Sequence, residues 1–161
     1  MVLAAHPEIS NTPSPRARWM GVLASSNGHD MEAFATDASL PQRYEWLRRP
    51  ETGLVMVRGR MGGTGAPFNL GEMAVTRCTL RLDEGTVGVA HVRGRDVRHA
   101  ERAALLDALL QQAQASGQLQ MQWQRWIAPL ERLLEQRRQQ RAAQAASTQV
   151  EFFTVARGDS P

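Results

Sequence analysis

Lysine is absent from this sequence, cysteine and tyrosine occur once each, and there is no long hydrophobic run. A single cysteine cannot form a disulfide within the chain, and it cannot hold an iron–sulfur cluster, which needs about four thiolate ligands. One tyrosine and four phenylalanines are too few to favour a platform that stacks nucleobases. No segment approaches the roughly 20 apolar residues that cross a bilayer, and the N-terminal residues do not resemble a signal peptide. We therefore expect a cytoplasmic protein with no nucleic-acid or membrane partner.

All 19 basic residues are arginine, and 16 acidic residues leave a formal net charge of only +3. Genome composition alone explains a preference for arginine and is the simpler interpretation. The planar guanidinium group also matches phosphate and carboxylate, so an anionic partner remains open. A chain of 161 residues with 42% hydrophobic and 22% charged residues is typical of one globular domain.

The first half of the chain predicts two helices after a polar N-terminal tail. Residues 1–13 contain two prolines and are expected to be disordered, so the single domain spans 14–161. Ser14 and Pro15 have the residue types of an N-cap and a first helical position, and this helix should end near Asn27 and Gly28. A second helix is expected over 30–38, with Asp30 as its cap.

Three strands are expected next, over 53–60, 73–82 and 87–93, with a possible edge strand over 44–47. In the second of these, alternation places Cys78 on a buried face and Arg77 and Arg81 on the opposite face. A helix capped by Asp96 follows, and Pro129 suits the first turn of another helix. The segment VEFFTVARGD at the C-terminus resembles a strand. The predicted fold class is α+β, an antiparallel β-meander packed against N-terminal and C-terminal helices, with a C-terminal strand.

Motifs of a self-sufficient active site are missing. The four histidines show no HExxH spacing for a metal, and the sequence contains neither a GxSxG nucleophile turn nor a GxxxxGK[ST] phosphate loop. No metal or cofactor is therefore expected to be bound by this chain, and no residue is assigned a catalytic role.

The MGGTG loop, residues 61–65, is the most distinctive local feature. Glycines at 62, 63 and 65 could let the backbone approach a phosphate, or they could simply connect two strands as in many hairpins. Loop chemistry alone favours the second interpretation. In a meander, however, this loop, Arg95 and the start of the helix at Asp96 meet at one end of the sheet. The candidates for an anion site or an interface are Arg60, Gly62, Gly63, Thr64, Gly65, Arg95 and His99.

His99 has two interpretations. In the first turn of a helix it could relay protons or bind an anion when protonated. A structural role, in which His99 and Glu101 pair with neighbouring side chains, is the more usual one.

Several segments together resemble the PhnG subunits of the bacterial carbon–phosphorus lyase core complex. The similarity extends over about residues 16–159, and the ordered set is far more specific than any one motif. Its elements are Glu51–Val55, Arg60–Gly65, Gly94–Asp96, His99–Arg102, Asp107–Leu109, Ile127–Leu130, Phe152–Thr154 and Arg157–Asp159.

This resemblance implies an accessory subunit of a ribose 1-methylphosphonate 5-triphosphate synthase, a transferase that displaces the adenine of ATP by a phosphonate. In that family the reaction is attributed chiefly to PhnI, with PhnG, PhnH and PhnL required, and PhnJ later breaks the carbon–phosphorus bond. The implied partners are PhnH, PhnI and PhnJ, and ATP is the pathway substrate. An alternative from a different class is an independent small anion- or nucleotide-binding protein that uses the MGGTG loop.

The last predicted helix is polar nearly all round after Leu134 and has too little apolar surface to be stabilised by packing. Either it is solvated, or it and the following FFTV strand dock on another chain. For a subunit we favour the second, and we expect the isolated chain to self-associate.

Overall fold

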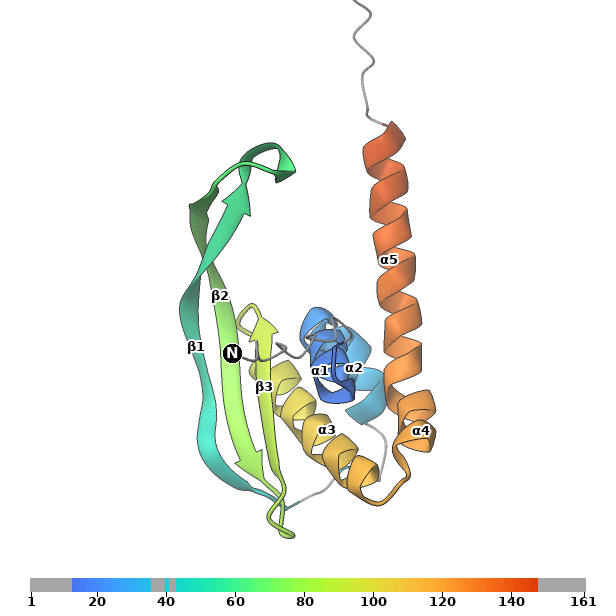
Figure 1. Cartoon of the computed structure of the whole chain (residues 1–161). Coiled ribbons are helices and arrows are strands. Elements are labelled where there is room, and N and C mark those ends of the chain that lie inside the picture. Colours follow the sequence, from blue (N-terminus) through green and yellow to red (C-terminus); the bar gives the residue numbers. More distant parts are fainter. Residues whose placement is uncertain (1–12, 36–39, 41–42, 148–161) are drawn as a thin grey trace, which may run out of the picture.

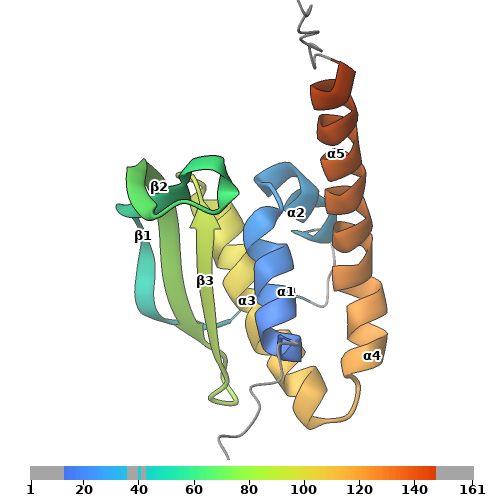
Figure 2. The same ribbon diagram turned by 45° about the horizontal axis from the view of Figure 1, so that its top comes forward.

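Three antiparallel strands form a sheet whose one face is covered by helices (Figures 1 and 2). The computed structural model describes residues 13–35, 40 and 43–147. The predicted α+β class is confirmed, whereas the N-terminal tail and the C-terminal strand of the prediction lie outside the described residues. The elements are α1 (Pro15–Ser25), α2 (Gly28–Ala35), β1 (Glu45–Arg60), β2 (Pro67–Arg81), β3 (Val87–Arg93), α3 (Val97–Ala115), α4 (Leu119–Gln122) and α5 (Ala128–Ser147).

The sheet has the order β1-β2-β3, so the predicted meander is confirmed. The third strand has the predicted bounds, but β2 begins at Pro67 rather than at 73. The predicted segment 53–60 and residues 45–47 of the predicted segment 44–47 belong to one strand, β1, which continues through Pro50. Proline is tolerated there because β1 is an edge strand and its register shifts between Arg48 and Glu51.

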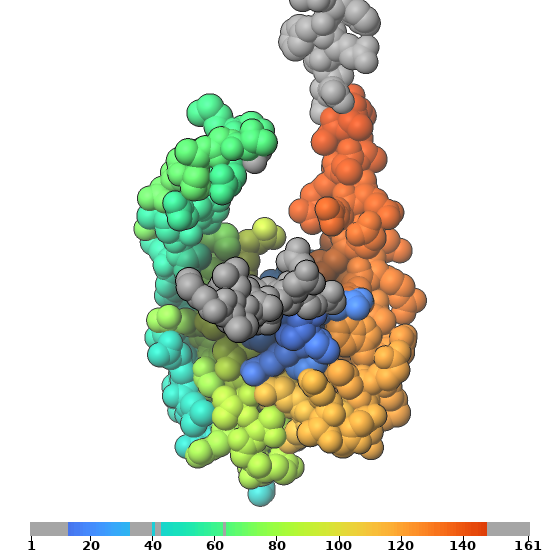
Figure 3. Space-filling view, viewed as in Figure 1, coloured from blue at the N-terminus to red at the C-terminus, as the bar shows by residue number. Residues whose placement is uncertain are grey.

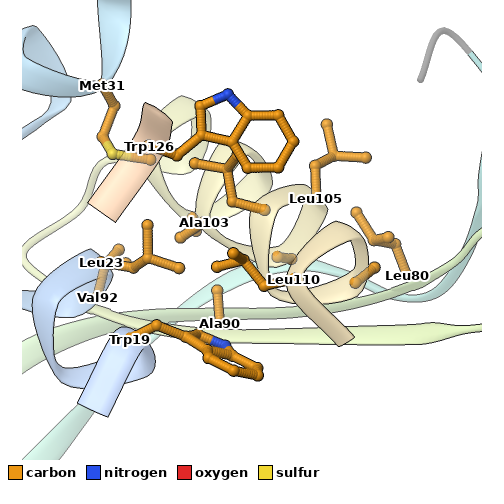
Figure 4. Close-up of a cluster of buried hydrophobic side chains, with 14 of the residues drawn as sticks. Trp19, Leu23, Met31, Leu80, Ala90, Val92, Ala103, Leu105, Leu110 and Trp126 are labelled. Carbon is orange, nitrogen blue, oxygen red and sulfur yellow. The ribbon is translucent and has the colours of Figure 1, made fainter. Parts of the chain in front are cut away.

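The hydrophobic core is built around α3, which packs against the sheet on one side and against α1, α2 and the turn before α5 on the other (Figure 4). Thr76, Cys78 and Leu80 alternate onto the covered face of β2 and are fully or nearly fully buried. The helix approaches β3 so closely that a Cβ atom at Gly88 would lie 2.0 Å from the carbonyl oxygen of Ala104. Only glycine fits at that position, because a side chain would force the helix and the sheet apart.

Asp107 of α3 fixes the position of α1 and β3. Its carboxylate is completely buried and accepts hydrogen bonds from Trp19 Nε1 at 2.9 Å and from the amide of Val89 at 3.0 Å. Arg16 donates to the same carboxylate with Nε and Nη2, at 3.2 and 2.9 Å. One side chain therefore joins three elements and satisfies buried donors of two of them.

The helix caps confirm two of three predictions. Ser14 Oγ accepts from the amide of Ala17, and an Asp96 carboxylate oxygen accepts from the amide of His99. The predicted cap at Asp30 is wrong: α2 begins at Gly28, after Asn27. Asn27 and Asp30 instead exchange reciprocal side chain to backbone hydrogen bonds, so Asp30 is the second half of a capping box.

Helix α5 begins at Ala128, with Pro129 in its first turn as predicted. The preceding residues, Trp123–Ile127, form a π-helical turn that buries Trp126 and Ile127 in the core. From residue 135 to residue 147 every side chain except Arg137 is exposed, and this half of the helix projects beyond the domain (Figure 1). Among the described residues, no helix is long and apolar enough to cross a bilayer.

Arg137 attaches α5 to α2 through Asp30, whose side chain is almost fully buried. The hydrogen bond from Arg137 lowers the pKa of the Asp30 carboxyl below its usual value, against the effect of burial. Because the folded-state pKa is lowered, this pair stabilises the fold above the unfolded pKa of about 3.9 and loses its contribution as the pH falls through the folded pKa.

We expect the Asp30→Asn variant to be less stable than the parent at neutral pH and to lose less stability on acidification, because the titrating group is gone. Thermal melts between neutral pH and about pH 2 measure both effects. Asp83→Asn, at an exposed turn position, is the matched control. Parallel pH curves for Asp30→Asn and the parent protein would contradict this prediction.

Candidate functional site: an apolar arm and the cleft beside it

A two-stranded arm extends beyond the three-stranded part of the sheet. Strand β3 pairs with β2 only from Val75 to Arg81, and its last partner pair is Val75 and Arg93. In the described structure, β1 and β2 continue as a pair without a third strand over residues 54–60 and 67–74. We call these residues and the loop that joins them the arm (Figure 1). A lone pair of strands is at best marginally stable in water, so this arm needs support from elsewhere.

The arm exposes an unusual amount of apolar side chain. Leu54 is 63% exposed, Leu70 66% and Met61 78%. The alternation of the ladder places Leu54 and Met56 on one face of β1 and Val55 on the other, so both faces are apolar. Surface of this kind usually marks a protein–protein contact. The exposed apolar side chains of the arm are Leu54, Val55, Met56, Met61, Phe68, Leu70 and Met73.

The MGGTG loop forms the tip of the arm and is held by its own contacts. The amide of Gly65 donates to the carbonyl oxygen of Met61 at 3.0 Å, and Arg60 Nη1 donates to the carbonyl oxygen of Gly65 at 3.0 Å. Gly62 has a φ of 60°, and a Cβ at Gly65 would lie 2.7 Å from the Met61 oxygen. The glycines therefore serve a tight turn here, while Thr64 is exposed. This geometry supports the interpretation as a hairpin connection.

The prediction that this loop lies close to Arg95 and to the start of α3 is wrong. The chain leaves the sheet at Gly94, whose amide donates to the carbonyl oxygen of Ala74. From Ala74 to Pro67, β2 runs seven more residues, which is about 23 Å of extended strand. The direction of the strands was predicted correctly, but β1 and β2 are much longer than β3. Arg60 and Arg95 therefore belong to separate places, and Arg95 is exposed.

His99 lies inside the fold. Its side chain is 2% exposed, and Nε2 is 2.7 Å from the carbonyl oxygen of Leu23 at the end of α1. This contact ties α3 to α1, which supports the structural interpretation. Glu101 accepts from the hydroxyl of Tyr44 rather than pairing with an arginine of its own helix. Burial and the Glu101 carboxylate together raise the pKa of Tyr44 to about 12.

Cys78 is not a nucleophile of this fold. The residue is 1% exposed, and burial raises the pKa of its thiol to about 12, so the thiolate is scarce at neutral pH. The prediction of a buried small hydrophobic residue is confirmed. Within the described ranges, no three histidine, cysteine or acidic residues are grouped so as to hold a metal ion.

A cleft of about 750 Å³ separates the base of the arm from α5 (Figure 3). The arm contributes Val55 and Met73, and α5 contributes Leu134, so the middle of the cleft is apolar. Arginines surround it, and a smaller hollow of about 250 Å³ adjoins it near the start of α2. The arginines of the cleft are Arg93, Arg138 and Arg141.

Sequence reasoning missed both the arm and the cleft. The segment PFNLGE at 67–72 contains proline, asparagine and glycine and has the composition of a loop, yet it is strand. The only signal was the apolar content of residues 53–57 together with Phe68 and Leu70, on strands with no evident partner. The cleft had no local signal, because its arginines come from β3 and α5.

Comparison with known proteins decides the family. The profile of the family described as phosphonate metabolism protein PhnG matches residues 14–158. The chain belongs to the PhnG family. The chain is also 46% identical over 113 residues, which is 70% of each sequence, to the "Alpha-D-ribose 1-methylphosphonate 5-triphosphate synthase subunit PhnG" of Rhizobium meliloti (strain 1021). The resemblance noted in the sequence is confirmed, and a role in phosphonate metabolism follows for this PhnG-family chain.

Membership of this family agrees with the geometry. The relative is named as a subunit of a synthase, and the arm of this PhnG-family chain carries apolar side chains that are exposed in the described structure. Among the described residues, no side chain combines burial in a cleft with the perturbed ionisation of a general acid or base. The described arrangement is that of a binding surface.

Proposed function

We propose that this chain is an accessory subunit of a ribose 1-methylphosphonate 5-triphosphate synthase, and that the arm is the surface by which it docks on the other subunits. The observation that carries the proposal is the two-stranded arm with apolar side chains exposed on both faces. The identity of the enzyme is inferred from the name of the relative that this chain resembles. The partners proposed are PhnH, PhnI and PhnJ, with PhnI holding the chemistry of the exchange between ATP and a phosphonate. A cytoplasmic location also stays a prediction.

Co-purification tests this proposal. The chain, tagged at one terminus in its native source, should bring down the PhnH, PhnI and PhnJ subunits in fixed ratio. Recovery of the tagged chain alone from cells that express all four proteins would contradict the role of a subunit.

The alternative of an independent nucleotide-binding protein gains no support from the geometry. The amide of Gly65 and the carbonyl oxygens of Met61 and Gly65 are engaged within the tip loop. The positive φ of Gly62 shapes the turn.

The isolated chain is expected to release no adenine from ATP in the presence of a phosphonate. The physical reason is that the described residues provide no activated nucleophile and no metal-binding group. Chromatography of the reaction mixture measures free adenine, and addition of the PhnI subunit with its partners should restore release. Adenine formed by a rigorously pure single-subunit preparation would contradict the accessory role.

Arg60→Ala and Arg95→Ala are expected to leave the melting temperature within about 2 °C of the parent value, since exposed side chains usually contribute less than about 0.5 kcal/mol. If these arginines contact partners, the same variants should weaken assembly or the ATP-dependent exchange. Thermal melts and reconstituted assays on both variants measure the two effects. Variants with full assembly and full activity would remove both residues from the interface.

A further inference from the structure

One hydrogen-bonding edge of the arm, on the β3 side of β2, has no partner strand among the described residues, and the neighbouring residue Met73 lines the cleft. The Gly94 amide donates to the Ala74 carbonyl, so Ala74 directs its peptide groups toward β3. Residues two apart in a ladder face the same side, and the amide and carbonyl of Glu72 therefore point to that edge as well. Strand β3 does not reach Glu72, because its pairing ends at Val75 and the chain turns away at Gly94 with a φ of 97°. Within residues 13–35, 40 and 43–147, no third strand pairs with the outer half of β2.

The surroundings of this edge specify the chemistry of an occupant. Met73 and Leu134 give the cleft an apolar middle, and Arg93, Arg138 and Arg141 stand around it. Among the described residues, none of the three arginines has a carboxylate partner, and the one hydrogen bond is from Arg141 Nε to the carbonyl oxygen of Arg137. Guanidinium groups grouped without counter-charges attract carboxylates.

We infer that an extended, acidic segment of another subunit adds to β2 as a third strand of the arm, with its carboxylates on Arg93, Arg138 and Arg141. Strand addition supplies main-chain hydrogen bonds to Glu72, and the flanking cleft receives alternate apolar side chains. The added segment occupies the position beside β2 that β3 occupies up to Arg93, where the pairing of β3 ends. This inference rests on the proposed function, because it names how the accessory subunit engages its partner.

Other occupants match the cleft less well. A second copy of this chain would bring the same arginines face to face, and like charges in an interface disfavour association. A free triphosphate would meet the apolar side chains in the middle of the cleft. The outer edge of β1 also has no partner strand among the described residues, but β3, which supplies Arg93 to the cleft, lies on the other side of β2 from it.

Hydrogen exchange on the assembled complex tests the position of the added strand. In the complex purified from cells that co-express all the subunits, the amide of Glu72 should exchange at least about tenfold more slowly than in the isolated chain. Leu54 and Met56, whose amides face the outer edge of β1, should change little. Protection of the β1 edge with an unchanged Glu72 would overturn the inference.

Paired proline and alanine variants test the main-chain contact. Met56 and Glu72 are direct cross-strand partners, and the amide of each faces outward, so a proline at either position leaves the ladder between β1 and β2 in place. Glu72→Pro should weaken assembly at least about tenfold relative to Glu72→Ala, whereas Met56→Pro and Met56→Ala should assemble alike. Equal assembly of Glu72→Pro and Glu72→Ala would overturn the inference. Circular dichroism of each variant checks the fold.

Variants that remove charge, and the salt dependence of assembly, test the contact made by the arginines. The double variant Arg138→Gln/Arg141→Gln should weaken assembly at least about tenfold and reduce its dependence on salt. Arg132→Gln, an exposed arginine of the same helix outside the cleft, should assemble as the parent does. A parent-like double variant would overturn the carboxylate contact. So would binding of ATP alone to the isolated chain through these two arginines, since that result makes the cleft a nucleotide site.

Two further results separate this inference from the proposed function. If no subunit co-purifies with the parent chain, the proposed function fails. If the complex forms but Glu72 is unprotected, only the added strand is wrong. A chain truncated after Ser147 should keep the protection of Glu72 in the complex, and loss of protection would assign the strand to this chain's own C-terminal segment.

Discussion

Asp107→Ala is expected to lower the free energy of unfolding by about 3–5 kcal/mol. The substitution removes the acceptor of the Trp19 indole N–H and of the Val89 amide, both of which stay inside the fold. It also leaves the Arg16 guanidinium without its partner, although that side chain is 43% exposed and can turn to solvent. Buried donors without an acceptor cost far more than the bond itself contributes in net terms.

Urea unfolding, followed by circular dichroism at low protein concentration, measures this loss. Asp83→Ala, at an exposed turn position, is the matched control and should stay within about 0.5 kcal/mol of the parent. Asp107→Asn should fall between the two, because an amide keeps one acceptor oxygen but not the charge. A loss below about 1 kcal/mol for Asp107→Ala would show that Asp107 does not hold α1 and β3 together.

Leu54→Ser/Leu70→Ser in the arm is expected to weaken assembly with the other subunits at least about 100-fold. Each leucine that becomes buried at an interface contributes about 1.5–3 kcal/mol, and tenfold in Kd corresponds to about 1.4 kcal/mol. The melting temperature should hardly change, because both side chains are largely exposed in the isolated chain. Co-purification from cells and titration of the purified variant measure the effect.

Met121→Ser on α4 is the matched control for the arm, because Met121 is 59% exposed but lies outside the arm. It should leave assembly unchanged. The arm also gives a second reason for the predicted self-association of the isolated chain: sedimentation should show dimers or larger species for the parent, strengthened by salt that screens the arginines, and monomers for the double variant. A monomeric parent at high concentration would contradict this.

Local sequence rules predicted the elements whose ends depend on neighbouring residues. Ser14 and Asp96 cap their helices because a side-chain oxygen reaches an amide three residues on, and Pro129 lies in the first turn of α5, directly after the π-helical turn. The bounds of β3 were correct since its alternation is bounded by turn residues on both sides. These features need no information from distant parts of the chain.

The family could also be read from the sequence, because an ordered set of short motifs over most of the chain is specific even when each motif is weak. The residues of the site could not. Arg60, Gly62 and Gly65 form a self-contained tip, and His99 is buried against α1. The spacing of glycines in a sequence does not distinguish a glycine-rich hairpin from a phosphate-binding loop, since both require the same backbone freedom.

The sequence by itself determined the α+β class, the meander, most helix starts, the buried state of Cys78 and membership of the PhnG family. Only the tertiary structure decided that β1 and β2 are longer than β3, that His99 and Asp107 face the interior, and that β3 and α5 place three arginines around one cleft. The physical reason is range: caps and alternation follow from contacts within a few residues, whereas strand length and side-chain grouping depend on which distant elements pack together.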